Sequence, residues 1–407
     1  MSRLSVVVLV CLGFALASPA SSVRAGAQAK PPQPGNSHPV YKELRSLAVG
    51  TEAYKVTNLV LTKDAAAFTL TGTLHMLAAV QGKVTGAVFL GQGSMAYTPP
   101  LAAERSMLSI LTKGEPFAET FERAVFRFTD DTADAIKQGA AGTVAGPDAQ
   151  AQDLLKDTNQ ALRVKLKDNL PARLLQDVLS PAPGRLFHAY ISGKKYSSKL
   201  IYIMDPHGAG PVSPEEIQLV SWADFKEGIF AAHHYSDFYR TRQRVTPSPG
   251  LWIDIESQQL DVEIEGSGEI SGVATTTFSS MIDGVAAVPL SLFPTLRVSS
   301  VTDADGKELP FIQESKEDDA DFWIALAKPA NKGEEVTVRT TYKGKDAISD
   351  ETPRTARRSC CGRPRCSSRR WDRSARPPRT RPRSPRRRSR CSSIPTTSVR
   401  WRTSACT

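Results

Sequence analysis

Six histidines are the side chains best suited to metal or acid–base chemistry, and they are His38, His75, His188, His207, His233 and His234. A zinc hydrolase helix carries His-Glu-x-x-His, in which the glutamate activates the zinc-bound water. No histidine here is followed by glutamate, so none begins that motif. His233, His234 and Asp237 lie close in sequence, but adjacent side chains of a strand point to opposite faces and rarely share one metal ion. We therefore expect this segment to be strand or loop surface.

Two further groups of side chains have ligand-binding chemistry. One is an acidic cluster with oxygen ligands for calcium, formed by Glu314, Glu317, Asp318, Asp319 and Asp321. It lacks the Asp-x-Asp-x-Asp-Gly spacing, which favours a solvated loop. The other is an aromatic set suited to stacking on a sugar or peptide, formed by Trp222, Trp252, Trp323, Tyr235, Phe238 and Tyr239. Aromatic residues at strand spacing more often belong to a core, and we predict that role for them.

Motifs of other enzyme classes are missing from the sequence. It contains no Gly-x-Ser-x-Gly, and no Gly-Lys pair is followed by Ser or Thr, as a phosphate-binding loop requires. Cys11 lies in an N-terminal apolar segment and the other five cysteines begin at Cys360, so the segment between them has no thiol. The sequence thus predicts no catalytic, metal-binding or cofactor-binding residue in this chain.

The net charge of +10 is distributed unevenly. Residues 353–407 contain 18 arginines, no lysine and one acid, Asp372, so they carry +17 and the rest of the chain carries −7. High charge with few hydrophobic residues predicts a disordered tail over 347–407. A genuine basic arm for nucleic acid and a structured element are alternatives. The abrupt loss of lysine is typical of a GC-rich coding sequence read in a shifted frame, which is our preferred interpretation, and no nucleic-acid partner is predicted.

The N-terminus has the pattern of an export signal. Arg3 precedes an apolar run from Leu4 to Ala17, and small residues continue to Ala29. We predict a signal peptide over 1–29 and a periplasmic or secreted protein without a stable membrane span after cleavage, a retained anchor being the alternative. Residues 30–40 are rich in Pro and Gly and are predicted to be a linker.

The segment 41–245 is predicted to be an N-terminal α+β extension domain. Alternating and β-branched stretches predict strands at 55–61, 67–74, 83–90, 124–129, 186–191, 199–204 and 217–222. Helical periodicity predicts a helix over 102–111 and two helices within 148–179, separated near Pro171.

The segment 246–346 is predicted to be an antiparallel β-sandwich or saddle. Two long alternating stretches flank Gly266, Ser267 and Gly268, which predicts a hairpin. A strand over 296–301 is followed by a tight turn at Asp303–Gly306 and a returning strand from Leu309. Two more strands surround a loop at 329–333, and the last one ends at Tyr342.

Within this segment, the runs LDVEIEGSGEISGVATTTF, VPLSLFPTLRVSSVTDADGKELPF and KGEEVTVRTTYKG resemble the N-terminal β-domain of the M1 zinc aminopeptidases, the gluzincins. The resemblance covers residues 251–345. It implies the non-catalytic β-region of an exported metallopeptidase, which in whole members packs against the zinc domain and helps to enclose the cleft for a peptide substrate.

The resemblance identifies no active-site residue in this chain. The family's His-Glu-x-x-His and Gly-x-Met-Glu-Asn motifs are both absent, so we expect this chain to be inactive and zinc to belong to full-length relatives only. Without the domain that normally packs on it, the β-region is expected to expose an apolar face. The alternative is an extracytoplasmic β-sandwich module that binds a polysaccharide or a protein. The oligomeric state stays open.

Overall fold

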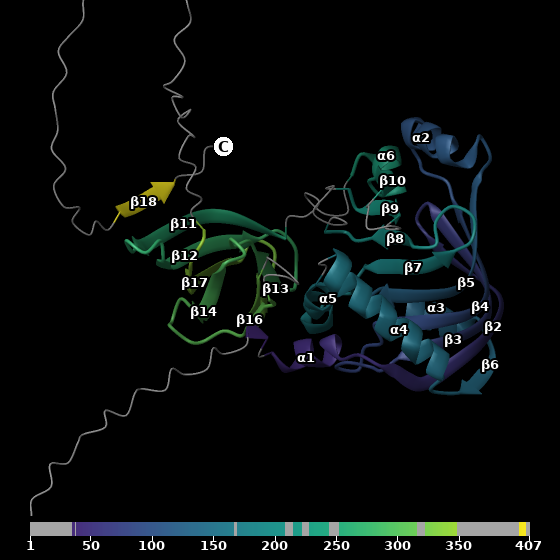
Figure 1. Ribbon diagram of the computed structural model, residues 1–407, viewed down its shortest axis with the longest axis horizontal. Coiled ribbons are helices and arrows are strands. Elements are labelled where there is room, and N and C mark those ends of the chain that lie inside the picture. The colour runs from purple at the N-terminus through teal and green to yellow at the C-terminus, as the bar shows by residue number, and fades with distance from the viewer. Residues whose placement is uncertain are drawn as a thin grey trace, which may run out of the picture. The chain divides into compact units, whose positions relative to one another are not determined.

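The fold is built from three antiparallel sheets with helices added between strands (Figure 1). The computed structural model describes residues 38–166, 169–207, 215–221, 228–243, 252–315 and 322–347, without the side chains of 165 and 166, and the backbone of 35–36 and 399–403. The prediction of a mainly antiparallel β-protein with helical insertions is confirmed.

The first half of the chain forms a nine-stranded sheet with the order β10-β9-β8-β7-β5-β4-β3-β2-β6. Alternation along the strands gives this sheet two apolar faces, one carrying Phe68, Phe126 and Phe187, the other Val125 and Tyr190. All seven strands predicted for this half are present. The strand bounds are β2 (Val49–Lys63), β3 (Ala66–Leu77), β4 (Gly86–Tyr97), β5 (Phe117–Phe128), β6 (Ala140–Ala145), β7 (Phe187–Gly193), β8 (Leu200–Met204), β9 (Ile217–Ser221) and β10 (Gly228–His233).

Helices cover both faces of this sheet. The helix bounds are α1 (Pro39–Arg45), α2 (Ala102–Thr112), α3 (Thr132–Gln138), α4 (Ala149–Ala161), the π-helical turn η1 (Leu162–Leu166), α5 (Leu170–Leu179) and α6 (Ser236–Thr241). The two helices predicted within 148–179, separated near Pro171, are present as α4 and α5, and α5 begins after the N-cap Asn169, whose side chain accepts the N–H of Ala172. Proline is tolerated in the first helical turn, where its missing N–H leaves no bond unmade.

The second half forms two sheets. A five-stranded sheet has the order β14-β17-β12-β11-β18, and a four-stranded sheet has the order β1-β15-β16-β13. Their bounds are β1 (Gly35–Asn36), β11 (Ile253–Ile264), β12 (Ile270–Ser280), β13 (Val285–Leu290), β14 (Leu296–Asp303), β15 (Phe311–Gln313), β16 (Phe322–Ala330), β17 (Glu335–Gly344) and β18 (Val399–Thr403). The predicted hairpin between β11 and β12 is confirmed.

The predicted tight turn after β14 is also present, with Gly306 at φ 82° and its N–H bonded to the carbonyl of Asp303. The strand that follows does not stay beside β14. Instead β15 pairs with β16 of the other sheet, so this turn carries the chain from one sheet to the other.

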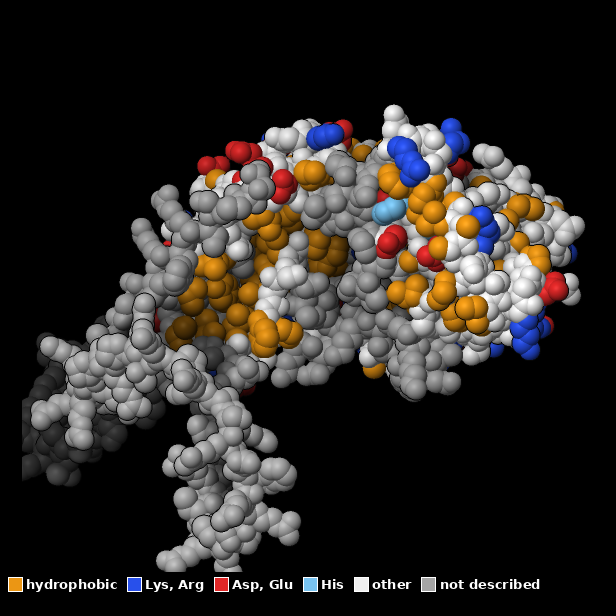
Figure 2. Space-filling view, turned by 90° about the horizontal axis from the view of Figure 1, so that it is seen from above, with side chains coloured by type: hydrophobic (Ala, Val, Ile, Leu, Met, Phe, Trp, Pro, Cys, Tyr) orange, Lys and Arg blue, Asp and Glu red, His pale blue; other side chains and the backbone are white. Residues whose placement is uncertain are grey.

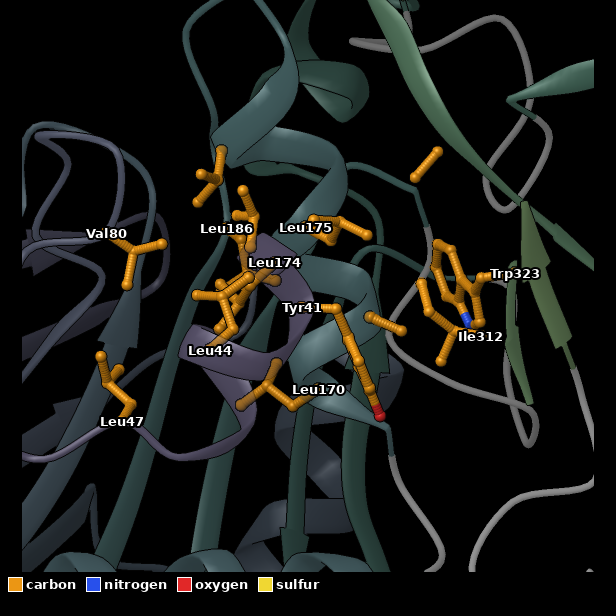
Figure 3. Packing of buried hydrophobic residues seen from close by; sticks show 14 of the residues in the cluster. Tyr41, Leu44, Leu47, Val80, Leu170, Leu174, Leu175, Leu186, Ile312 and Trp323 are labelled. Atoms are coloured by element: carbon orange, nitrogen blue, oxygen red, sulfur yellow. The ribbon is translucent and has the colours of Figure 1, made fainter. Parts of the chain in front are cut away.

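One hydrophobic core joins elements from both halves of the chain. Tyr41 and Leu44 of α1 and Leu170 of α5 belong to the same buried cluster as Ile312 and Trp323 of the four-stranded sheet (Figure 3). The side chain of Gln176 on α5 accepts the N–H groups of Ala286 and Ala287 and donates to the carbonyl of Gly284. These residues belong to one compact unit, Pro34–Thr407.

Several predictions fall on residues that the structure does not describe. These are the signal peptide over 1–29, most of the linker, the division near residue 245 and most of the tail beyond 347. They stay predictions. Among the helices of the described residues, none combines the length and the hydropathy needed to span a membrane.

Candidate functional site

The histidine pair of the sequence HHYSD does not form a metal site. His233 ends β10 and is buried against Tyr97, with ring centroids 5.9 Å apart, so the expectation of a surface position is wrong for it. Packing of its ring on the aromatic core outweighs the polarity of its nitrogens. His234 instead places Nδ1 2.6 Å from Oε2 of the buried Glu216. Asp237 is exposed and pairs with Arg240, so the three side chains do not converge.

Of the predicted acidic cluster, the structure describes only Glu314, because residues 316–321 lie outside the described part of the chain. Its carboxylate accepts Nε of Arg45 at 2.8 Å and the hydroxyl of Tyr41. Burial alone would raise the pKa of Glu314, but the hydrogen bonds from Arg45 and Tyr41 outweigh it and lower the pKa. This residue is therefore an ion-paired link from α1 to the loop after β15, which corrects the prediction of a solvated loop for Glu314.

The members of the aromatic set that the structure describes do not form one stacking platform. Trp252 and Trp323 are buried and meet at 5.4 Å between ring centroids in an edge-to-face contact, as the core prediction requires. Phe238 and Tyr239 are not buried, so the core prediction is wrong for these two residues. Their rings contact that of His234, whose backbone N–H donates to the hydroxyl of Tyr239 at 3.0 Å. Trp222 lies outside the described residues.

A buried charge cluster was missed by the sequence analysis. Arg173 of α5 donates Nε and Nη2 to the two carboxylate oxygens of Asp205 at 2.7 and 2.8 Å, and Nη1 to Asp177 at 2.8 Å. The i,i+4 spacing of Arg173 and Asp177 was the one signal available in the sequence. Burial alone would raise the pKa of Asp205, but the charge and hydrogen bonds of Arg173 hold it at about 2.

Two histidines and a tryptophan complete this cluster. Burial lowers the pKa of His188 and of His207 to about 4, so both rings are neutral at pH 7. The ring of His207 lies 4.2 Å from that of Trp252, and Cζ of Arg173 lies 4.9 Å from the same indole. Every described member is buried, so the cluster fixes α5 against Trp252 at the start of β11.

The surface best suited to binding is an open apolar face on the five-stranded sheet. We use this name for the buried Ala274, Leu296 and Tyr342 with the partly buried Leu260, Ile270, Leu292 and Ala347 around them. At its margin Ile264, which pairs with Ile270, is 57 % exposed. Figure 2 shows hydrophobic side chains gathered in a hollow over the part of the molecule that carries β11 to β17.

The pleat of β12 explains why this face is left open. Residues 272, 274, 276 and 278 lie on one side of the strand, and Phe278 packs into the main core while Ala274 lies outside it. The four-stranded sheet thus covers only one end of the row. At the other end Tyr342 lies across Gly272, where a Cβ atom would come within 2.7 Å of the tyrosine hydroxyl. The described residues contain no group of three or more His, Cys, Asp or Glu arranged to hold a metal.

Among known proteins, only solved structures match this chain, and the following two cover a small part of it. No family model and no curated protein matches the chain. Among solved structures, a two-domain M1 zinc metallopeptidase mutant bound to L-tryptophan is 22 % identical, with 25 % of this chain and 22 % of that chain covered and a TM-score of 0.21. The M1 zinc metallopeptidase from Deinococcus radiodurans is 24 % identical, with 25 % and 23 % covered and the same TM-score. The chain thus spans less than a quarter of these structures, and no activity is transferred from them.

Proposed function

We propose that this chain supplies the non-catalytic β-region of an exported M1-type metallopeptidase and that the open apolar face is where a further domain packs. The observation that carries the proposal is the open apolar face itself. Burying apolar surface contributes about 25 cal/mol per Å². Contiguous apolar patches on soluble proteins mark interaction sites. A cluster built around Leu260, Ile270 and Tyr342 is therefore suited to dock another domain.

The sequence resemblance supports the same assignment. The open apolar face lies almost entirely within residues 251–345, the stretch whose strands and turns resemble the N-terminal β-domain of M1 zinc aminopeptidases. The described residues do not fit a zinc centre, so no catalytic step is assigned to this chain. In this proposal zinc and the peptide substrate belong to the domain that covers the open apolar face.

A matched pair of variants tests the docking role. The probe is the catalytic domain of an M1 zinc metallopeptidase produced without its own β-region and titrated against the full chain. We expect Ile264→Asp to weaken binding at least about 10-fold, because it places a charge at the margin of the open apolar face. Val60→Asp is the control, since Val60 is 56 % exposed on the nine-stranded sheet, far in sequence from the face. No binding, or equal weakening by both variants, would overturn the proposal.

The non-catalytic role has its own test. The purified full chain is expected to carry no stoichiometric zinc and to release no amino acid from aminoacyl-anilide substrates. Metal analysis and an anilide assay in the same sample measure both. Stoichiometric zinc together with turnover would show that this chain holds an active site of its own.

A further inference from the structure

The outer edge of β6 is an open end of the nine-stranded sheet. That sheet ends on β10 at one side and on β6 at the other (Figure 1). β6 pairs with β2, and no other strand of the described residues lies beside it. Residues 141–145 of the strand are exposed. The main-chain N–H and C=O groups along the outer side of β6 are therefore accessible to a further strand.

Other edge strands of this molecule are closed by side chains. Glu104 of α2 accepts the N–H of Ala232 on β10 at 3.1 Å, at the opposite end of the same sheet. The amides of Gln313 and Gln176, which both accept and donate, bond backbone groups of the edge strand β14 and at the start of the edge strand β13. Side chains in these places take hydrogen bonds that a neighbouring strand would otherwise make, so these edges are protected from further pairing.

β6 has no such protection. Its sequence, AAGTVA, contains no lysine, no other charged residue and no proline, which are the residues that usually block an edge. None of the described side chains bonds the backbone of 140–145. The register with β2 shifts between Lys55 and Val56, but 142–145 pair with 52–55 without a break. This stretch is a regular strand with one side open.

The residues of β6 suit pairing with an identical strand. When two copies of a strand pair antiparallel about a two-fold axis, one residue lies opposite its own copy. With Thr143 in that place, Gly142 lies opposite Val144. Threonine pairs are favourable across antiparallel strands, and glycine leaves room for the branched valine. Like charges do not meet, because the strand has none, and side chains this small form no pockets to select a different peptide.

We propose that the outer edge of β6 pairs antiparallel with β6 of a second copy of this chain, so that two nine-stranded sheets join into one continuous sheet. Main-chain hydrogen bonds supply the affinity in this mode of association. One short strand pair is a small interface, so the dimer is weak and forms as the protein concentration rises. This edge contains no residue of the open apolar face, so its pairing does not depend on the proposed function.

Charge variants of the full chain test the pairing. In reducing buffer, sedimentation velocity over about a 100-fold range of concentration should show reversible association of the wild type. We expect Thr143→Lys to weaken association at least about 5-fold, because two lysines then meet at the two-fold axis. Thr62→Lys is the matched control, since Thr62 is exposed on β2 outside the stretch paired with β6, and it should associate like the wild type. Circular dichroism checks that both variants stay folded.

A mixture of variants identifies the pairing of β6 with itself. Thr143→Glu alone should also associate more weakly, whereas an equal mixture of Thr143→Lys and Thr143→Glu should recover association, because opposite charges then meet across the axis. Amide protection at 142–145 should rise with protein concentration. A monomer throughout, equal behaviour of Thr143→Lys and Thr62→Lys, or no recovery in the mixture would overturn the proposal. Loss of association in Ile264→Asp but not in Thr143→Lys would assign the contact to the open apolar face and overturn it as well.

Discussion

At the scale of single residues, the buried charge cluster combines one ionised pair with two neutral histidines. Arg173 is charged and its partner Asp205 is kept ionised, with a pKa of about 2, while His188 and His207 beside them are kept neutral. A buried ion pair tolerates little additional charge, since each further unpaired charge must be taken out of water. The two histidines therefore act as neutral spacers, and their protonation is linked to unfolding.

This linkage predicts an acid-sensitive stability. The pKa of His207 is about 4 in the folded protein and about 6.5 when unfolded, so its contribution is complete above pH 6.5 and is lost as the pH falls toward 4. His207→Phe keeps a ring against Trp252 and removes the titration. We expect this variant to lessen the loss of unfolding free energy between pH 6.5 and 4 by up to about 1.4 kcal/mol per pH unit. Urea denaturation at several pH values measures it.

A separate pH window serves as the internal control. The pKa of Asp205 is depressed, so its contribution is present above its unfolded value and is lost as the pH falls through about 4 to 2. His207→Phe should leave the loss below pH 4 in place. If the variant and the wild type lose stability in parallel from pH 6.5 to 4, His207 is not neutral in the fold.

The core positions of the two tryptophans near this cluster were predictable from the sequence, but the contacts between the charged residues were not. Sequence reasoning placed Trp252 and Trp323 in the core, and both are there. It did not join Arg173 to Asp205, because 32 residues and two strands separate them and neither belongs to a motif. It also left His233 on the surface, because the aromatic ring that covers it, Tyr97, comes from β4, more than a hundred residues earlier.

At the scale of elements, a glycine pair allows β3 and β4 to cross closely. Gly72 and Gly91 are opposite each other, and a Cβ atom on Gly72 would lie 2.3 Å from the carbonyl oxygen of Leu90. We expect Gly72→Ala to lower the free energy of unfolding by about 1–3 kcal/mol or more, because rigid backbone must move. Gly142→Ala on β6 is the matched control, since a Cβ atom added there would meet no atom within 4 Å, and it should be neutral or slightly stabilising. Chemical denaturation compares the two, and equal effects would contradict the close approach.

The elements themselves were the most predictable part of the fold. Period-2 alternation marked the strands that became β2, β3, β5, β7, β8 and β9, because each has at least one buried face. Boundaries were less certain, since β4 begins at Gly86 and not at residue 83. Sheet membership was not predictable at Gly306, where local turn chemistry gave the reversal but tertiary packing of Phe311 and Ile312 assigned β15 to the other sheet.

At the scale of the whole molecule, the two halves of the chain are joined by buried polar contacts as well as by apolar packing. Gln176 reaches from α5 to three backbone groups around β13, at 2.7, 2.8 and 3.0 Å. Gln313 makes a comparable pair of bonds inside the second half, accepting the N–H of Val298 and donating to the carbonyl of Leu296. Both side chains are buried, so each holds backbone groups that water cannot reach.

These two glutamines allow the coupling between the halves to be measured. Gln176→Leu leaves buried backbone groups unpaired at the junction, at a cost of about 1–3 kcal/mol. Because those groups connect the halves, we expect one calorimetric transition for the wild type and two for Gln176→Leu. Gln313→Leu carries a similar local cost within the β-region, so it should lower that region's own stability without uncoupling it from the nine-stranded sheet. A single transition in Gln176→Leu, shifted no further than in Gln313→Leu, would mean that the apolar core joined by Tyr41 and Ile312 suffices to couple the halves, and that Gln176 contributes only locally.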